Sequence, residues 1–200
     1  KRNLKNKGCV MKRYFKNKKL LERNNVYSKD MEHDACGVGL VASTEGKKSR
    51  KVVEYGIQAL KAVWHRGAVD ADGKTGDGAG IHVEIPKEFF KEKIEVTGHV
   101  YDNSEICIGM IFLPRNNYEA QESCRTLVEK ELTQNDFNIY GWRQVPVNTK
   151  VLGEKAEQTR PEITQVLFRH NNQKLSGKSL EIKLYETRRK IENNVRQNHL

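Results

Sequence analysis

The residue with the most direct capacity for chemistry is Cys36, in the segment Glu32-His-Asp-Ala-Cys-Gly-Val-Gly. A thiolate is a strong nucleophile. If the chain is cut between Ala35 and Cys36, the same residue also carries a free α-amine, whose ordinary pKa of about 7.7–8.0 suits a general base near neutral pH. Cys36 is therefore a candidate nucleophile with its own candidate base. The alternative is that Cys36 is a buried small hydrophobe, as we expect for Cys107 and Cys124.

The second candidate is the glycine-rich segment that follows His65. Residues 67–80 hold five of the fifteen glycines and predict an irregular, tightly folded loop. Such a loop could wrap a site and bring Arg66 and Asp77, with their neighbours Gly67 and Gly78, to a small polar ligand. The alternative is a plain connection between a helix and a strand.

Two familiar loop types do not fit this segment. A phosphate-binding loop needs four residues between its first glycine and Gly-Lys-Thr, and here five residues separate Gly67 from Gly73. An EF-hand would place its obligatory glycine at Thr75 and its final glutamate at Ile81. The four cysteines include no CxxC pair, so the sequence predicts neither a structural zinc site nor a disulfide framework, and we expect no metal.

Hydrophobic periodicity predicts which elements position these residues. Val53, Ile57 and Leu60 recur at helical spacing after Ser49, a candidate N-cap. The expected helices span 49–64, 87–93, 117–132 and 181–194, and the expected strands span 36–42, 81–85, 106–113, 137–145 and 163–168. The strand at 106–113 is apolar on both pleat faces, which predicts a sheet covered on both sides. The alternation of helices and strands indicates an α/β or α+β fold, with α+β preferred.

Charge is concentrated in the first 35 residues. The chain has 36 Lys and Arg against 26 Asp and Glu, a net charge of +10. Eleven of those basic residues and only four of the acidic ones precede Cys36, so the leader carries +7. A solvated tail or removable pro-segment, a transit peptide and a nucleic-acid-binding arm with Tyr14 and Phe15 all remain open. No apolar run approaches the roughly 20 residues of a membrane span.

Several of these segments resemble the amidotransferase region of the glutamate synthase large-subunit family. The similar blocks are Glu32–Ala42, His65–Ala68, Asp72–Gly80, Gly141–Val147, Val151–Gly153 and Pro161–Gln165. The resemblance implies an N-terminal nucleophile hydrolase fold, a four-layer αββα sandwich that is incomplete at its C-terminal end. It also implies that residues 1–35 are a removed pro-segment and that residues 36–200 are the N-terminal part of a class-II glutamine amidotransferase domain.

In that family the residue matching Cys36 attacks the carboxamide of L-glutamine, forms a glutamyl thioester and releases ammonia. The resemblance makes Arg66, Gly67, Asp77 and Gly78 supports of the active site. The family's glutamine-binding and oxyanion-hole residues lie beyond residue 200, so we expect the fragment alone to be inactive.

For the whole enzyme the resemblance implies FMN, an iron–sulfur cluster (3Fe-4S), 2-oxoglutarate and an electron donor, which is NADPH, NADH or ferredoxin. A small electron-transfer subunit is a further partner of such enzymes. We expect no cofactor in this segment, no nucleic-acid or membrane partner, and a cytoplasmic location with a plastid as the alternative. A stand-alone class-II amidotransferase and a nucleic-acid-binding protein are the competing functions.

Overall fold

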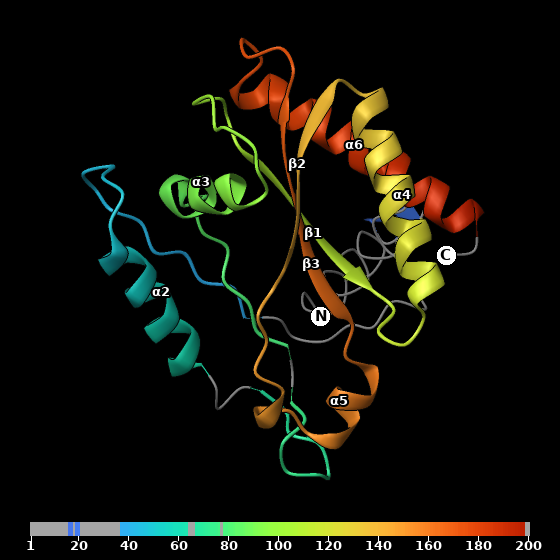
Figure 1. The fold of residues 1–200 in the computed structure, drawn as a ribbon. Coiled ribbons are helices and arrows are strands. Elements are labelled where there is room, and N and C mark those ends of the chain that lie inside the picture. The colour runs from blue at the N-terminus through green and yellow to red at the C-terminus, as the bar shows by residue number, and fades with distance from the viewer. Residues whose placement is uncertain (1–15, 18, 21–36, 64–66, 77, 199–200) are drawn as a thin grey trace. The chain divides into compact units, whose positions relative to one another are not determined.

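The computed structural model describes residues 16, 17, 19, 20, 37–63, 67–76 and 78–198 (Figure 1). The chain divides into two units, Lys1–Leu40 and Val41–Leu200. In the first unit, residues 16, 17, 19 and 20 are helical, which the sequence did not predict for the leader, and residues 37–40 belong to no helix or strand. The elements that follow all lie in the second unit.

The second unit is a mixed α and β structure with one antiparallel sheet. Its helices are α2 (Arg50–Ala62), α3 (Lys87–Val96), α4 (Tyr118–Gln134), η2 (Thr149–Val151), α5 (Glu154–Thr159) and α6 (Gly177–Gln197). Its strands are β1 (Cys107–Leu113), β2 (Phe137–Gln144) and β3 (Glu162–His170). Four expected helices and three expected strands are confirmed within a few residues, and α5 and η2 were not expected.

Polar side chains fix where two of these helices begin. The Ser49 hydroxyl accepts a hydrogen bond from the amide of Lys51 at 3.2 Å, and the side-chain oxygen Oδ1 of Asn117 accepts one from the amide of Ala120 at 3.0 Å. Each bond satisfies an amide that has no partner inside its helix. The N-cap predicted at Ser49 is therefore confirmed.

The strands lie in the order β1-β3-β2, with β3 in the centre. Leu167 of β3 is opposite Ile108 of β1 on one side and Gly141 of β2 on the other. Both pairings are antiparallel, and the register of β2 shifts between Ile139 and Gly141. Tyr140 is the extra residue at this β-bulge.

Helices lie on both sides of the sheet (Figure 1), and each face of the sheet has its own buried core. On one face α4 and α6 pack against the strands, and their buried apolar residues are Cys107, Val128, Leu132, Phe137, Val166, Phe168 and Leu180. On the other face α3 contributes Phe90 and Ile94, which pack with Ile106, Tyr140 and Leu167. Because α3 has only ten residues, it covers the second face incompletely.

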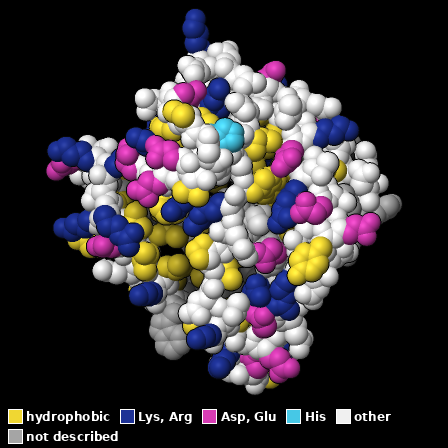
Figure 2. Space-filling model, viewed as in Figure 1, with side chains coloured by type: hydrophobic (Ala, Val, Ile, Leu, Met, Phe, Trp, Pro, Cys, Tyr) yellow, Lys and Arg dark blue, Asp and Glu magenta, His cyan; other side chains and the backbone are white. Residues whose placement is uncertain are grey.

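Part of that second face is open. Along β1, Met110 is 47% exposed and Phe112 is 63% exposed, whereas Cys107 and Leu113 at the two ends of the strand are buried. Figure 2 shows hydrophobic side chains gathered in a hollow of the visible face, with lysines and arginines around them. Among the described residues, the expectation that residues 106–113 are covered on both sides therefore holds at Ile106 and Ile108 and does not hold at Met110 and Phe112. Helix α2 likewise buries none of its residues.

Two expected strands do not form. Residues 37–42 and 81–85 belong to no strand, and neither segment is paired in a ladder with any described residue. An extended segment becomes a strand only when a neighbour satisfies its N–H and C=O groups. The segment 81–85 lies along α2 instead: Ile81 is 3.4 Å from the position of a Cβ at Gly56, and Glu84 pairs with Lys48.

Candidate active site

The predicted site residues divide between described and undescribed parts of the chain. Cys36, Arg66 and Asp77 lie outside the described residues. Gly67 and Gly78 are described, and both are exposed. No described atom lies within 4 Å of the place that a Cβ would take at Gly78. The part of the site that can be built from geometry is therefore the loop that leads to Gly78.

This loop is closed by its own backbone. Val69 and Gly76 form an isolated antiparallel bridge, and the amide of Asp70 donates to the carbonyl of Thr75 at 2.7 Å. Within the loop, the amide of Gly73 donates to the carbonyl of Asp70 at 2.9 Å. Gly73 has φ +68, which a glycine adopts without steric cost. The expected tight loop is therefore confirmed for residues 69–76.

The carboxylate of Asp72 is the centre of the loop. One of its oxygens accepts from the amides of Lys74 at 2.9 Å and Thr75 at 2.7 Å, and the other accepts from the Thr75 hydroxyl at 2.5 Å. The hydrogen bond from the Thr75 hydroxyl, followed by those from the two amides, holds the pKa of Asp72 well below its ordinary value of 3.8. The side chain is thus a fixed anion at neutral pH.

The same loop is attached to the start of α5, about 80 residues later in the sequence (Figure 1). Gly153 precedes α5, and a Cβ there would lie closer than 3.0 Å to both the Asp72 carboxylate and the Thr75 hydroxyl. The ammonium group of Lys155 pairs with the carboxylate of Asp70 at 2.6 Å. We call these contacts between residues 70–75 and residues 153–155 the loop latch.

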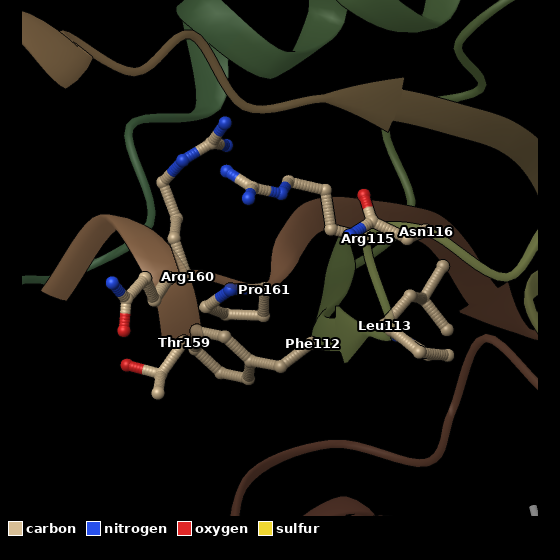
Figure 3. A pocket seen from close by; sticks show the side chains of 9 residues that line it. Phe112, Leu113, Arg115, Asn116, Thr159, Arg160 and Pro161 are labelled. Carbon is tan, nitrogen blue, oxygen red and sulfur yellow. The ribbon is translucent and has the colours of Figure 1, made fainter. Parts of the chain in front are cut away.

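The described residues also line a cavity of about 330 Å³ beyond the end of β1 (Figure 3). Its lining includes Phe112, Arg115, Arg160 and Pro161. The guanidinium groups of Arg115 and Arg160 point toward one another. Two like charges in such proximity need a counter-ion.

Glu157 supplies that counter-ion. It pairs with Arg115, and its other oxygen lies 3.0 Å from Nε of Arg160. The hydrogen bonds from Arg160 and Arg115 hold the pKa of Glu157 below its ordinary range. Because one carboxylate joins both guanidinium groups, the cluster connects the end of β1 to α5 and accounts for its arginines without a ligand.

A further polar cluster surrounds Asp102, in the connection between α3 and β1. Its carboxylate accepts from the Ser104 amide at 3.1 Å and from the Tyr140 hydroxyl at 3.3 Å, and it pairs with Arg169 at 3.3 Å. The hydrogen bonds from Ser104 are the largest cause of its lowered pKa. The cluster attaches this connection to β2 and β3 and is therefore structural.

Two kinds of feature are absent from the residues that the structure describes. They contain no group of three or more His, Cys, Asp or Glu side chains that could hold a metal ion. None of their helices is both long and apolar enough to cross a membrane.

The sequence does not predict the loop latch. It assigns no role to Asp72, Thr75 or Lys155, and the segment Val151–Gly153 belongs only to the resemblance. The only signal in the sequence was the Asp-x-Lys-Thr spacing of residues 72–75, which is typical of a side chain that bonds to backbone two and three residues later. The sequence around Gly153 and Lys155, which the loop contacts in the fold, has no pattern that predicts this contact.

Comparison with known proteins places the chain among amidotransferases. Residues 36–200 match the family described as glutamine amidotransferases class-II. The chain is 55% identical to the glutamate synthase [NADPH] large chain of Azospirillum brasilense over 172 residues, which is 86% of this chain and 11% of that protein.

Relatives with other electron donors in their names are also similar. The ferredoxin-dependent glutamate synthase of Cyanidium caldarium is 38% identical over 82% of this chain and 10% of its own length. The glutamate synthase [NADH] of Saccharomyces cerevisiae is 36% identical over 74% of this chain and 7% of its own length. The chain spans about a tenth of the length of the curated relatives that it matches.

Proposed function

This chain belongs to the class-II glutamine amidotransferases, and from that premise we propose that it is the glutamine-hydrolysing part of a glutamate synthase. The observation that carries the proposal is the identity of 55% to a glutamate synthase large chain over 86% of this chain. The resemblance read from the sequence is thereby confirmed at the level of the family, and the glutaminase half-reaction follows from it.

The proposed chemistry centres on Cys36 and begins after cleavage between Ala35 and Cys36. The α-amine takes the thiol proton, and the sulfur attacks the carboxamide carbon of L-glutamine. The C–N bond breaks as nitrogen takes a proton, which releases ammonia and leaves a glutamyl thioester. Water then attacks the thioester, which releases glutamate and restores the thiol. The match to the family begins at Cys36, which supports this residue as the first of the domain.

The supports of that site are also proposals. Arg66, Gly67, Asp77 and Gly78 would surround the substrate from the glycine-rich loop. Arg66 would supply a cation and Asp77 an anion, which suits a zwitterionic amino-acid substrate. The loop latch supports this assignment, because it fixes the loop next to Gly78.

In the whole enzyme the ammonia would combine with 2-oxoglutarate, and two electrons from NADPH, NADH or ferredoxin would reduce the product to a second glutamate. FMN and an iron–sulfur cluster (3Fe-4S) would supply this electron transfer, and a small electron-transfer subunit would be a partner. We assign none of this chain's residues to these groups.

We also propose the four-layer αββα sandwich for the complete domain. The open face of the sheet at Met110 and Phe112 supports it, since a second sheet would cover these side chains. Helix α2 supports it as well, because none of its apolar residues is buried by the described part of the chain, which leaves room for a further layer against them.

Residues 1–35 would be the removed pro-segment, and the enzyme would lie in the cytoplasm. The leader holds one serine, whereas transit peptides are rich in serine. The plastid is the alternative, and relatives from Spinacia oleracea and Arabidopsis thaliana are named chloroplastic. A stand-alone class-II amidotransferase is the second candidate function, and a nucleic-acid-binding role of the basic leader is the third.

The proposal is tested on the full-length protein purified from its own host. Intact mass and N-terminal sequencing should show a chain that begins at Cys36. The glutamine analogue 6-diazo-5-oxo-L-norleucine, a diazoketone, should alkylate Cys36. Cys36→Ser should abolish both this alkylation and glutamine hydrolysis. Cys124→Ser is the matched control and should keep both.

Assays with 2-oxoglutarate distinguish the first two functions. A glutamate synthase should form two glutamates from glutamine, 2-oxoglutarate and a reductant, whereas a stand-alone amidotransferase should form one. A native chain that still carries residues before Cys36 would contradict the glutaminase chemistry, because Cys36 would then lack its free amine. Nucleic-acid binding that disappears with residues 1–35 would support the third function instead.

A further inference from the structure

We propose that Asp72 and Gly153, which meet in the loop latch, position the glycine-rich loop for glutamine binding. This inference rests on the function proposed above, because it assigns Gly78 and its neighbours to the glutamine site. Asp72 is a positioning residue in this view. It acts through the loop and makes no contact with the substrate.

The first argument is that the latch does more than close the loop. The backbone bonds between Asp70, Gly73 and Thr75 already determine the shape of the turn. The contacts to Gly153 and Lys155 join segments about 80 residues apart, so they determine where the turn sits. A plain connection between a helix and a later segment needs only the first set.

The second argument comes from Gly153. Its φ of −76 and ψ of 165 are extended values that any residue adopts, so the backbone conformation does not require glycine. The contacts do require it, because a Cβ at this position would collide with the Asp72 carboxylate and with Thr75. The glycine is therefore needed for close approach alone.

The third argument concerns the start of α5. No side chain of its own caps this helix. The Asp72 carboxylate lies against Gly153, the residue that precedes the helix, where a Cβ would collide with a carboxylate oxygen. The anion that is bonded to Thr75 thus sits at the start of α5, and a shift of either segment separates the two.

The last step links the latch to substrate. Gly78 follows the bridge residue Gly76 by two positions, and no described atom lies within 4 Å of the place that a Cβ would take at Gly78. In this proposal its position is set through the chain connection to the latched turn. Loss of the latch should misplace the residues that meet glutamine while leaving Cys36 reactive, and weakened substrate binding appears in KM rather than in kcat.

The test uses the full-length enzyme and four variants. Gly153→Ala and Thr75→Val break the latch, Thr75→Ser keeps the hydroxyl, and Lys150→Ala in η2 is a nearby control outside the latch. Glutamine hydrolysis gives KM and kcat. Alkylation of Cys36 is followed with 6-diazo-5-oxo-L-norleucine, which requires the glutamine site, and with iodoacetamide, which requires only the thiolate.

We expect Gly153→Ala and Thr75→Val to raise the KM for glutamine about 10-fold or more, with kcat within about 3-fold of the wild type. Diazoketone alkylation should slow in the same proportion as KM rises, and iodoacetamide alkylation should stay unchanged. Thr75→Ser and Lys150→Ala should behave like the wild type.

Two results would overturn the inference. One is a wild-type KM in both latch variants. The other is a joint fall in kcat, in iodoacetamide alkylation and in thermal unfolding temperature, which would mean that the latch only stabilises the fold. A wild-type enzyme that neither hydrolyses glutamine nor reacts with the diazoketone at Cys36 is a different result. It would refute the proposed function, and the latch inference with it.

Discussion

Gly141 lies directly against Thr97: a Cβ at position 141 would come within 2.9 Å of the Thr97 methyl carbon. Gly141 follows the bulged residue Tyr140 in β2 and has φ +146. The bulge and the glycine together let β2 approach the C-terminal end of α3, where Thr97 donates a hydrogen bond to the carbonyl of Ile94 at 2.6 Å. This contact holds α3 on the sheet.

We therefore expect Gly141→Ala to lower the free energy of unfolding by about 2–4 kcal/mol, since it combines a forbidden backbone angle with a steric collision. Thr97→Ser removes the colliding methyl group and keeps the hydroxyl. The double variant should recover part of the loss, because the backbone strain remains. Urea unfolding of the four proteins of this cycle measures the recovery, and strictly additive losses would contradict the contact.

The cysteines should differ sharply in reactivity. Burial, with smaller contributions from Glu105 and Glu181, raises the pKa of Cys107 to about 12, and burial also raises the pKa of Cys124. Their thiolates are therefore scarce at pH 8, and the native protein should alkylate at Cys36 and spare both. Mass spectrometry of iodoacetamide-treated native protein measures this order. Rapid native labelling of Cys107 would show that the core around β1 is not as described.

Asp72 should keep its charge in acid. Its pKa is lowered in the folded protein, so its contribution to stability is complete above the ordinary value of 3.8 and is lost only as pH falls through the folded value. We expect the hydrogen bonds of the Asp72 carboxylate in the loop latch to persist below pH 3.8. Carbon NMR of the Asp72 carboxyl group during an acid titration checks this, and Thr75→Val should move the midpoint upward. A midpoint at the ordinary value in the wild type would refute the hydrogen bonds.

The open sheet face offers a test of the four-layer sandwich. Leu167 is fully buried, and Leu167→Ala should cost about 2–5 kcal/mol wherever it is measured. Phe112 is 63% exposed in this structure. In the full-length protein a second sheet would cover it, and Phe112→Ala should then cost about as much as a core substitution, about 3–5 kcal/mol. Val96→Ala, at a position that is 82% exposed, is the control and should cost less than about 0.5 kcal/mol.

A result for Phe112→Ala that matched the control in the full-length protein would contradict a covering sheet. The same experiment in a protein that ends at residue 200 is no substitute, because there the face has nothing to cover it. The prediction therefore rests on the difference in the free energy of unfolding lost by Phe112→Ala and by Val96→Ala in the full-length protein.

The sequence by itself determined the elements whose signals are local. Helix α2 begins after the N-cap Ser49, and α4 begins after Asn117, because a cap and a helical period need only neighbouring residues. The three strands of the sheet were also predicted, since each is a short apolar run between turns. The family followed from short blocks of sequence around Cys36 and the glycine-rich loop.

Tertiary structure decided what depends on partners far away in the chain. Residues 81–85 have the pattern of a strand and form none, because no described strand supplies their hydrogen bonds. Met110 and Phe112 have the pattern of a buried strand face and are exposed, because burial depends on what packs above them. The loop latch joins Asp72 to Gly153 across about 80 residues. Only the folded chain brings the Asp72 carboxylate against Gly153, which has no side chain to block its approach.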